Sequence, residues 1–148
     1  AHPQRFAPTH LRNGTLLIDD TFNAPPKGVK AAIDTLKQFA GKRIFVMTNM
    51  GELADEAARI HQEMGEWFHD AKLDGVLLFG DKGLLDNPLT ACPGAHYFED
   101  KAKLLAHLLP MLKKNTMLVI KGARSNTMET VVEGVIEAIG ETETAEVD

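Results

Sequence analysis

Two adjacent carboxylates are the first residues along the chain that could carry chemistry. Asp19 and Asp20 follow a short apolar run, and Asn23 and two prolines come next, before a helical pattern begins. Paired acids in a polar loop can hold a metal ion or accept hydrogen bonds from ribose hydroxyls. In the structural alternative, Asp20 only caps the following turn through backbone N–H groups. The spacing leaves both readings open.

A second polar stretch combines two cations with a hydroxyl group. Lys121, Arg124 and Ser125 surround Gly122, whose missing side chain would let the backbone approach a ligand. Such a set suits a carboxylate or a phosphate, and a guanidinium can bind two oxygens of either group at once. The structural alternative is a solvated first turn of a helix.

Several common cofactor and catalytic motifs are missing. The sequence contains neither the phosphate-loop motif nor G-x-G-x-x-G after its first apolar run. The histidines are not spaced as metal ligands, and His61 and His69 are expected at the surface or in a groove. Cys92 is the only cysteine and has no base nearby in sequence. Neither a nucleophile nor an internal disulfide is therefore expected, which fits a reducing compartment.

Apolar runs and helical periodicity alternate along the chain and would position these residues. Buried strands are predicted at residues 15–18, 43–47, 75–79, 96–98 and 116–120. Helices are predicted at residues 26–39, 54–71 and 101–112, and after residue 129 up to about residue 139. Strands alternating with helices indicate an α/β domain with a mostly parallel sheet.

The remaining segments are predicted from their turn-forming residues and charge. Residues 4–11 form the first arm of a hairpin and an edge strand, since Pro8 cannot donate to a ladder. Residues 81–94 are rich in glycine and proline, so they are predicted as loop with at most one helical turn. The domain is predicted to span residues 1–139, followed by a disordered acidic tail at 140–148.

One edge of the predicted sheet collects the polar loops. The carboxyl ends of parallel strands share an edge, where ligands of open α/β sheets bind. The loops at residues 19–24, 48–52 and 121–129 are therefore expected to lie together.

Composition excludes several classes of function. The 148 residues carry a net charge of −5, which favours neither nucleic acid nor an anionic membrane surface as a partner. The sequence has no apolar run long enough to span a bilayer and no signal-peptide pattern. Its length suits one domain with a sizeable core.

Four motifs occur in a fixed order along nearly the whole chain. Residues 13–24 read Asn-Gly-Thr-Leu-Leu-Ile-Asp-Asp-Thr-Phe-Asn-Ala, and residues 50–53 read Met-Gly-Glu-Leu. Residues 98–101 read Phe-Glu-Asp-Lys, and residues 121–125 read Lys-Gly-Ala-Arg-Ser. This ordered set resembles the C-terminal domain of the Mur ligases, in particular the type that adds D-alanyl-D-alanine.

The resemblance implies a Rossmann-like three-layer sandwich within a three-domain enzyme of peptidoglycan precursor synthesis. In that family the N-terminal domain holds a UDP-sugar peptide, and the central domain carries the phosphate loop and magnesium sites. ATP phosphorylates the peptide carboxylate, the amine of the incoming dipeptide attacks the acyl phosphate, and ADP and phosphate leave. The resemblance therefore implies ATP and Mg²⁺ as cofactors, with their phosphate and metal sites mainly in the central domain. It implies no catalytic residue and no metal ligand in this domain alone.

The resemblance also implies partners and a location. D-alanyl-D-alanine would bind this domain, and the UDP-N-acetylmuramoyl tripeptide would bind through the other domains. The N-terminal and central domains of the same protein would be its protein contacts. No nucleic acid or membrane is implied, and a monomer in the bacterial cytoplasm is expected.

Individual site residues follow from the matched motifs. The resemblance places three residues near the nucleotide: Asp20, Arg5 and Asn23. It places three residues near the dipeptide: Arg124, Ser125 and Lys121.

The chain departs from the family pattern at several positions. Phe22 replaces the usual tyrosine, Pro25 an asparagine, Asn49 an aspartate and Ala123 a serine. These departures leave open a different dipeptide specificity, or a divergent non-catalytic Rossmann-like binding module. Another amide ligase of the superfamily, of the folylpolyglutamate or cyanophycin synthetase type, is a further alternative. The loop at 121–125 argues against it.

Overall fold

A six-stranded sheet forms the middle layer of the molecule, with strand order β1-β2-β6-β3-β4-β5. The computed structural model describes residues 8–122 and 126–142. The strands are β1 (Thr9–His10), β2 (Thr15–Asp20), β3 (Lys42–Thr48), β4 (Gly75–Phe79), β5 (His96–Phe98) and β6 (Thr116–Lys121). β1 is antiparallel to β2, and all other neighbouring strands are parallel. The predicted mostly parallel sheet with an antiparallel N-terminal edge is confirmed.

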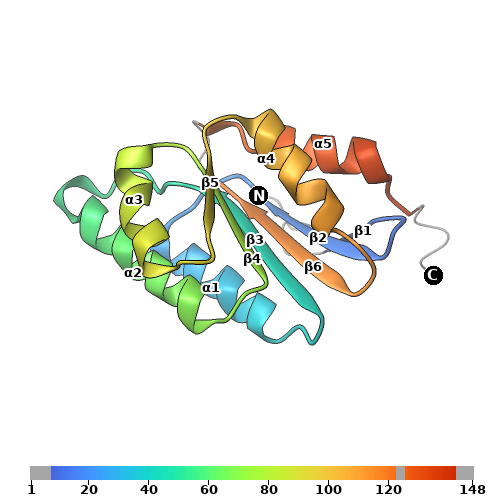
Figure 1. Ribbon diagram of the computed structural model, residues 1–148, viewed down its shortest axis with the longest axis horizontal. Coiled ribbons are helices and arrows are strands. Elements are labelled where there is room, and N and C mark those ends of the chain that lie inside the picture. Colours follow the sequence, from blue (N-terminus) through green and yellow to red (C-terminus); the bar gives the residue numbers. More distant parts are fainter. Residues whose placement is uncertain (1–7, 123–125, 143–148) are drawn as a thin grey trace.

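Helices cover both faces of the sheet, which gives the predicted three-layer sandwich (Figure 1). The α-helices are α1 (Pro26–Lys37), α2 (Ala57–Asp70), α3 (Lys82–Ala91), α4 (Lys101–Leu108) and α5 (Glu129–Ile139). The 3₁₀ turns that are described in full are η2 (Ala54–Glu56) and η3 (Leu109–Met111). Helices α1, α2 and α3 lie on one face, and α4 and α5 lie on the other.

The core consists of two apolar clusters separated by the sheet. Successive strand residues point to opposite faces, so Leu17 joins the cluster under α4 and α5, whereas Ile18 joins the one under α1 to α3. Val46 and Phe45 of β3 divide in the same way. Because both faces are covered, the middle strands are continuous apolar runs without polar alternation.

A helix occupies the segment 81–94, where the sequence predicts mainly loop. The carboxylate of Asp81 caps α3 by accepting a hydrogen bond from the Gly83 N–H at 2.9 Å. Pro88 lies inside the helix but is buried against α2, where a Cβ at Gly65 would lie 2.5 Å from the Pro88 Cα. The prediction was wrong because packing between α2 and α3 outweighs the unfavourable helix propensity of glycine and proline.

Two predicted elements are shorter than expected. The arm predicted at residues 4–11 forms a strand only at β1, and its residues 4–7 lie outside the described part of the chain. The helix predicted at 101–112 ends at the close of α4, and Pro110 lies in the 3₁₀ turn η3. A proline cannot donate an α-helical hydrogen bond, which accounts for the change.

The start of the acidic tail is bound to the hairpin. The Arg12 N–H donates to the Gly140 carbonyl, and the Thr142 N–H donates to the His10 carbonyl, each at 2.8 Å. Disorder was expected from residue 140 onward, but these hydrogen bonds hold residues 140–142 against the hairpin. The prediction was based on the acidic composition of the tail, on which backbone pairing does not depend. Residues 143–148 lie outside the described residues.

Candidate functional site

The loops that follow β2, β3 and β6 meet at one edge of the sheet. β6 lies between β2 and β3, and all three run parallel. Their carboxyl ends are therefore adjacent. This confirms the expected gathering of residues 19–24 and 48–52 with the described part of 121–129.

A buried ion pair joins two of the predicted site residues. Asp20 and Lys121 are register partners on β2 and β6, and the Lys121 Nζ lies 2.6 Å from Oδ2 of Asp20. Their side chains are 6% and 3% exposed, respectively. A buried charge is tolerated only when it is paired, so each group constrains the position of the other.

The turn-capping role belongs to Asp19 and not to Asp20. The Asp19 Oδ1 accepts hydrogen bonds from the backbone N–H of Thr21 at 3.2 Å and from its hydroxyl at 2.8 Å. This is an Asx turn, the local bonding expected of an aspartate before a loop. The structural alternative for Asp20 is therefore wrong, since its carboxylate is held by Lys121.

Of the two other predicted nucleotide contacts, the structure describes Asn23 but not Arg5. Asn23 is exposed on the loop between β2 and α1, and its Oδ1 accepts a hydrogen bond from the Ala24 N–H at 2.9 Å. The Asn23 side chain therefore lies at the same edge as Asp20. Arg5 lies outside the described residues.

The loop after β6 is only partly described. Arg124 and Ser125, both predicted dipeptide contacts, lie outside the described residues. A Cβ at Gly122 would lie 2.6 Å from Cγ of Met128, a side chain that is fully buried. The absence of a side chain at Gly122 is therefore already required by the packing of Met128, and the expected approach of a ligand to this backbone stays a prediction.

Asn49 connects three loops, a role that its sequence position did not reveal. Its Oδ1 accepts hydrogen bonds from the Asp81 N–H at 2.9 Å and from Nδ2 of Asn126 at 3.5 Å. The same oxygen would lie 2.2 Å from a Cβ at Gly80, where φ is +136°. Gly80 is thus required both by its backbone conformation and by the position of Asn49. The glycine directly after a predicted strand was the available sequence clue.

Lys101 holds the turn that precedes α5. Its Nζ donates to the Thr127 carbonyl at 3.0 Å and also to the Thr127 hydroxyl. Thr127 has a φ of +46°, a left-handed conformation that is uncommon for a β-branched residue. The ammonium therefore stabilises a strained turn beside the loop that contains the predicted dipeptide residues.

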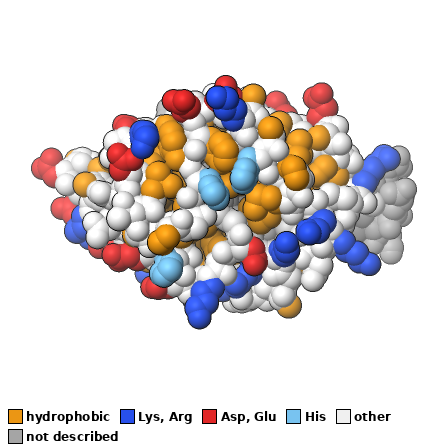
Figure 2. Space-filling view, in the orientation of Figure 1, with side chains coloured by type: hydrophobic (Ala, Val, Ile, Leu, Met, Phe, Trp, Pro, Cys, Tyr) orange, Lys and Arg blue, Asp and Glu red, His pale blue; other side chains and the backbone are white. Residues whose placement is uncertain are grey.

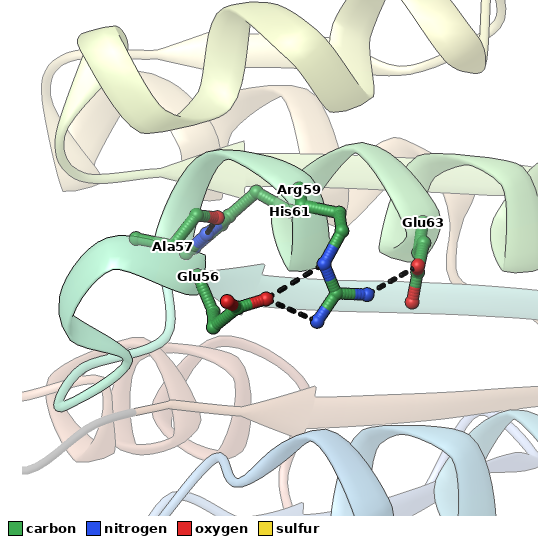
Figure 3. A network of polar contacts seen from close by, with 5 residues as sticks. All are labelled: Glu56, Ala57, Arg59, His61 and Glu63. Atoms are coloured by element: carbon green, nitrogen blue, oxygen red, sulfur yellow. Dashed lines mark hydrogen bonds and ion pairs between the residues drawn. The ribbon is translucent and has the colours of Figure 1, made fainter.

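His61 fixes the loop after β3 to helix α2. Its Nε2 accepts a hydrogen bond from the Met50 N–H at 2.9 Å, so Nδ1 carries the proton and donates to the Ala57 carbonyl at 2.7 Å (Figure 3). The side chain is fully buried, and the expectation of a surface or groove residue was wrong. Burial lowers the pKa of His61, while the Ala57 hydrogen bond and the charge of Asp81 oppose that shift.

Figure 3 also shows an exposed ion network on the first turns of α2. Arg59 binds Glu56 in the 3₁₀ turn η2 and Glu63 one turn further along α2, the latter at 2.7 Å. Exposed ion pairs of this kind contribute little to stability because water and salt screen them. The network therefore supports the start of α2 and is not a candidate site.

Among the described residues, the remaining histidines and the cysteine do not form a metal centre or an activated nucleophile. Figure 2 shows histidines in the middle of one broad face. The rings of His96 and His107 lie with centroids 5.2 Å apart. Within residues 8–122 and 126–142, no group of three or more histidine, cysteine, aspartate or glutamate residues could hold a metal ion. Burial raises the pKa of the Cys92 thiol, which leaves it a poor nucleophile.

The part of the chain that the structure describes has no helix with the length and apolar character needed to cross a membrane.

Comparison with known proteins identifies close relatives. The family described as "Mur ligase, glutamate ligase domain" matches residues 4–124. The UDP-N-acetylmuramoyl-tripeptide–D-alanyl-D-alanine ligase of Haemophilus influenzae is 34% identical over 86% of this chain, and that of Escherichia coli is 33% identical over 93%. The matches cover 29% and 30% of those two proteins, so the chain spans less than a third of their length.

Solved structures show the same similarity. The MurF ligase of Thermotoga maritima in complex with ADP superposes with a TM-score of 0.81 at 29% identity, covering 91% of this chain and 31% of that one. A MurF structure from Acinetobacter baumannii gives a TM-score of 0.81 at 26% identity, covering 93% of this chain and 30% of that one.

Proposed function

Because the chain belongs to the Mur ligase family, in which it matches the glutamate ligase domain, we propose that it is the C-terminal domain of a ligase. This domain would close over the bound substrates. The full-length protein would use ATP to join D-alanyl-D-alanine to a UDP-N-acetylmuramoyl tripeptide. Relatives that match most of this chain carry that activity in their names. The proposed cellular role is peptidoglycan precursor synthesis in the bacterial cytoplasm, where ATP and UDP-linked precursors are available.

One observation carries the proposal for this chain itself. The loop that resembles the nucleotide side of the family and the loop that resembles the dipeptide side lie on neighbouring parallel strands. They are joined by the ion pair between Asp20 and Lys121. A domain with both loops on one edge can contact the nucleotide and the incoming amine together as it closes.

The nucleotide side is assigned to the loop after β2. We propose that Asp20 and Asn23 contact the nucleotide from this loop, with Oδ1 of Asp20 as the acceptor for a ribose hydroxyl, and that Arg5 also contacts the nucleotide. Lys121 binds the other oxygen, Oδ2. The ADP complex of the Thermotoga relative supports nucleotide binding in this family. A carboxylate acceptor at the end of a parallel strand is a common way to hold a ribose.

The dipeptide side is assigned to the loop after β6. We place Arg124 and Ser125 there, because a guanidinium matches the two oxygens of a C-terminal carboxylate. The described residues offer no three-ligand metal cluster, so we assign Mg²⁺ no ligand on this part of the chain. When bound, Mg²⁺ would neutralise the charge that develops on the transferred phosphoryl group.

The chemistry requires two successive transfers. The γ-phosphoryl group passes from ATP to the peptide carboxylate and gives an acyl phosphate and ADP. The dipeptide amine then attacks the acyl carbon, phosphate leaves and the amine loses a proton. Binding both reactants against one closing domain supplies the orientation that makes the second step effectively intramolecular.

The proposal is tested by the substrate dependence of the full-length protein. Phosphate release should require ATP, the UDP-N-acetylmuramoyl tripeptide and D-alanyl-D-alanine together, and mass spectrometry should show the UDP-linked pentapeptide. A matched reaction with glutamate in place of D-alanyl-D-alanine tests a folylpolyglutamate-type ligase. Product with glutamate alone, or no product with any acceptor, would overturn the assignment.

A further inference from the structure

The ammonium of Lys121 lies close to the first turn of α1 as well as to Asp20. A Cβ built on Gly28, in the first turn of α1, would lie 3.2 Å from the Lys121 Nζ and 3.4 Å from its Cε. The same position lies 3.3 Å from Cγ of Pro25. The ammonium is therefore placed between Asp20 and the first turn of α1, on the side assigned to the nucleotide.

The ion pair with Asp20 is difficult to reconcile with a direct contact between Lys121 and an incoming dipeptide. Both side chains are buried, but the pair uses the single ammonium of Lys121 and only one of the two carboxylate oxygens of Asp20, Oδ2. A dipeptide would have to separate a buried pair and leave the Asp20 carboxylate without its cation, which is costly. A lone cation would also face the positive end of α1, an unfavourable position.

Asp20 depends on Lys121 for its position. A buried charge is tolerated only when it is paired, so removing the ammonium would leave the carboxylate without its partner. With the ammonium at Oδ2, the orientation of the carboxylate at the end of β2 is fixed. Gly28 contributes by leaving room for the ammonium, since any larger residue would crowd it.

We infer that Lys121 is a positioning residue for the nucleotide, which acts through Asp20, and not the dipeptide contact that the sequence resemblance suggests. Gly28 is its steric counterpart on α1. This inference rests on the proposed function, in which Asp20 meets the nucleotide.

The test is a double-mutant cycle in the full-length ligase, with KM measured separately for ATP and for D-alanyl-D-alanine. K121M should raise the KM for ATP by on the order of tenfold and leave the dipeptide KM within about twofold. In a D20N background, K121M should have almost no further effect on the KM for ATP, because the pair acts as one unit. K121R, which keeps the charge, should recover part of the loss.

Two further variants separate positioning from folding. D20N/K121M has no buried charge at either position, so it should fold even if K121M does not. G28A keeps both charges but crowds the ammonium, and should raise the KM for ATP more than the dipeptide KM. K103M, at an exposed lysine of α4, is the matched control and should change neither. Urea unfolding of each variant shows that the assays measure folded protein.

The possible outcomes distinguish the inference from the proposed function. A larger rise in the dipeptide KM than in the ATP KM, or independent effects of D20N and K121M, would overturn the role of Lys121 while the ligase assignment stands. An unchanged ATP KM in D20N would overturn both the Asp20 contact and the inference. Absence of ligase activity in the unmutated protein would overturn the proposed function itself.

Discussion

At the scale of single residues, polar side chains decide how the loops of the candidate site are held. Asn49 stands where the resembled family has an aspartate, yet the hydrogen bonds from Asp81 and Asn126 both go to its carbonyl oxygen. An aspartate oxygen could accept the same bonds. Asn49 departs from the family pattern, but it therefore keeps the hydrogen-bond acceptor that connects the loops.

Replacing Asn49 should distinguish the contribution of its side-chain oxygen, a hydrogen-bond acceptor, from that of its side-chain nitrogen. Asn49→Ala removes the partner of the Asp81 N–H and should lower the free energy of unfolding by about 1 kcal/mol. Asn49→Asp keeps the acceptor and should cost less than half as much. Urea unfolding of the purified chain measures both changes. Equal losses for the two variants would show that the amide nitrogen matters as much as the oxygen.

The buried His61 should make stability depend on pH. Its pKa in the folded chain is lowered, mainly by burial, so below its ordinary value of about 6.5 the unfolded chain binds a proton that the folded chain resists. The His61 contribution is therefore fully present above that pH and is lost as pH falls below it. Protonation of Nε2 would also remove the acceptor for the Met50 N–H.

The measurement is the free energy of unfolding between about pH 7.5 and pH 5, compared between the unmutated chain and two variants. His61→Gln should be less stable at neutral pH but should lose less stability on acidification. His69→Gln, at an exposed position of the same helix, should follow the unmutated chain. If the unmutated chain and His61→Gln show parallel pH curves, His61 does not control this dependence.

Side-chain roles were predictable only in part from the sequence. The resemblance drew attention to Asp20 and Lys121. The ion pair between them, however, forms only because β2 and β6 are neighbours in the sheet, although the two residues are about a hundred positions apart in sequence. The burial of His61 likewise depends on the loop that folds back over α2. Long-range partners of this kind leave no local periodicity to detect.

At the scale of elements, the bounds of helices and strands were predicted best where the sequence carried a single clear residue pattern. The strands β4 and β5 match their predicted bounds. For β4, a short apolar run between turn-forming residues leaves few alternatives. The segment that forms α3 contains Gly83 and Pro88 and was misread, since its helix depends on contact with α2. Local propensity is a weak guide when tertiary packing supplies the stability.

Gly65 should therefore be intolerant of a side chain. A Cβ there would lie 2.5 Å from the Cα of Pro88 and 2.7 Å from its carbonyl oxygen, both backbone atoms that cannot rotate away. Gly65→Ala would otherwise favour the helix by up to about 1 kcal/mol, but overpacking should make it destabilising by about 1–3 kcal/mol. Gly94→Ala is the control, because nothing lies within 4 Å of its Cβ position. A more stable Gly65→Ala variant would mean that α2 and α3 separate easily.

At the scale of the whole molecule, the proposed function makes the chain one side of a reaction centre. It lacks a phosphate-loop sequence, and its described residues offer no cluster of metal ligands. Its relatives are about three times as long, in agreement with a division of labour between domains. The fold and the meeting of the loops at one edge of the sheet were predictable from the sequence, because both follow from the alternation of strands and helices.

The purified 148-residue chain alone should neither hydrolyse ATP nor form an amide bond. Phosphoryl transfer needs a metal and a phosphate cradle to stabilise the developing charge, and the sequence has no phosphate loop. The measurement is Mg²⁺-dependent ADP release, with a heat-inactivated sample as the control. ADP release clearly above that control would show that the chain contains a complete site.

Both outer strands of the sheet are short, which has a consequence for self-association. β1 has two residues and β5 has three, and the bridge between Leu11 and Glu141 continues the pairing beside β1. The long apolar strands β3, β4 and β6 lie between neighbours on both sides. Little unpaired backbone is therefore offered to a strand from another molecule, and the sheet should resist edge-to-edge aggregation despite its apolar middle.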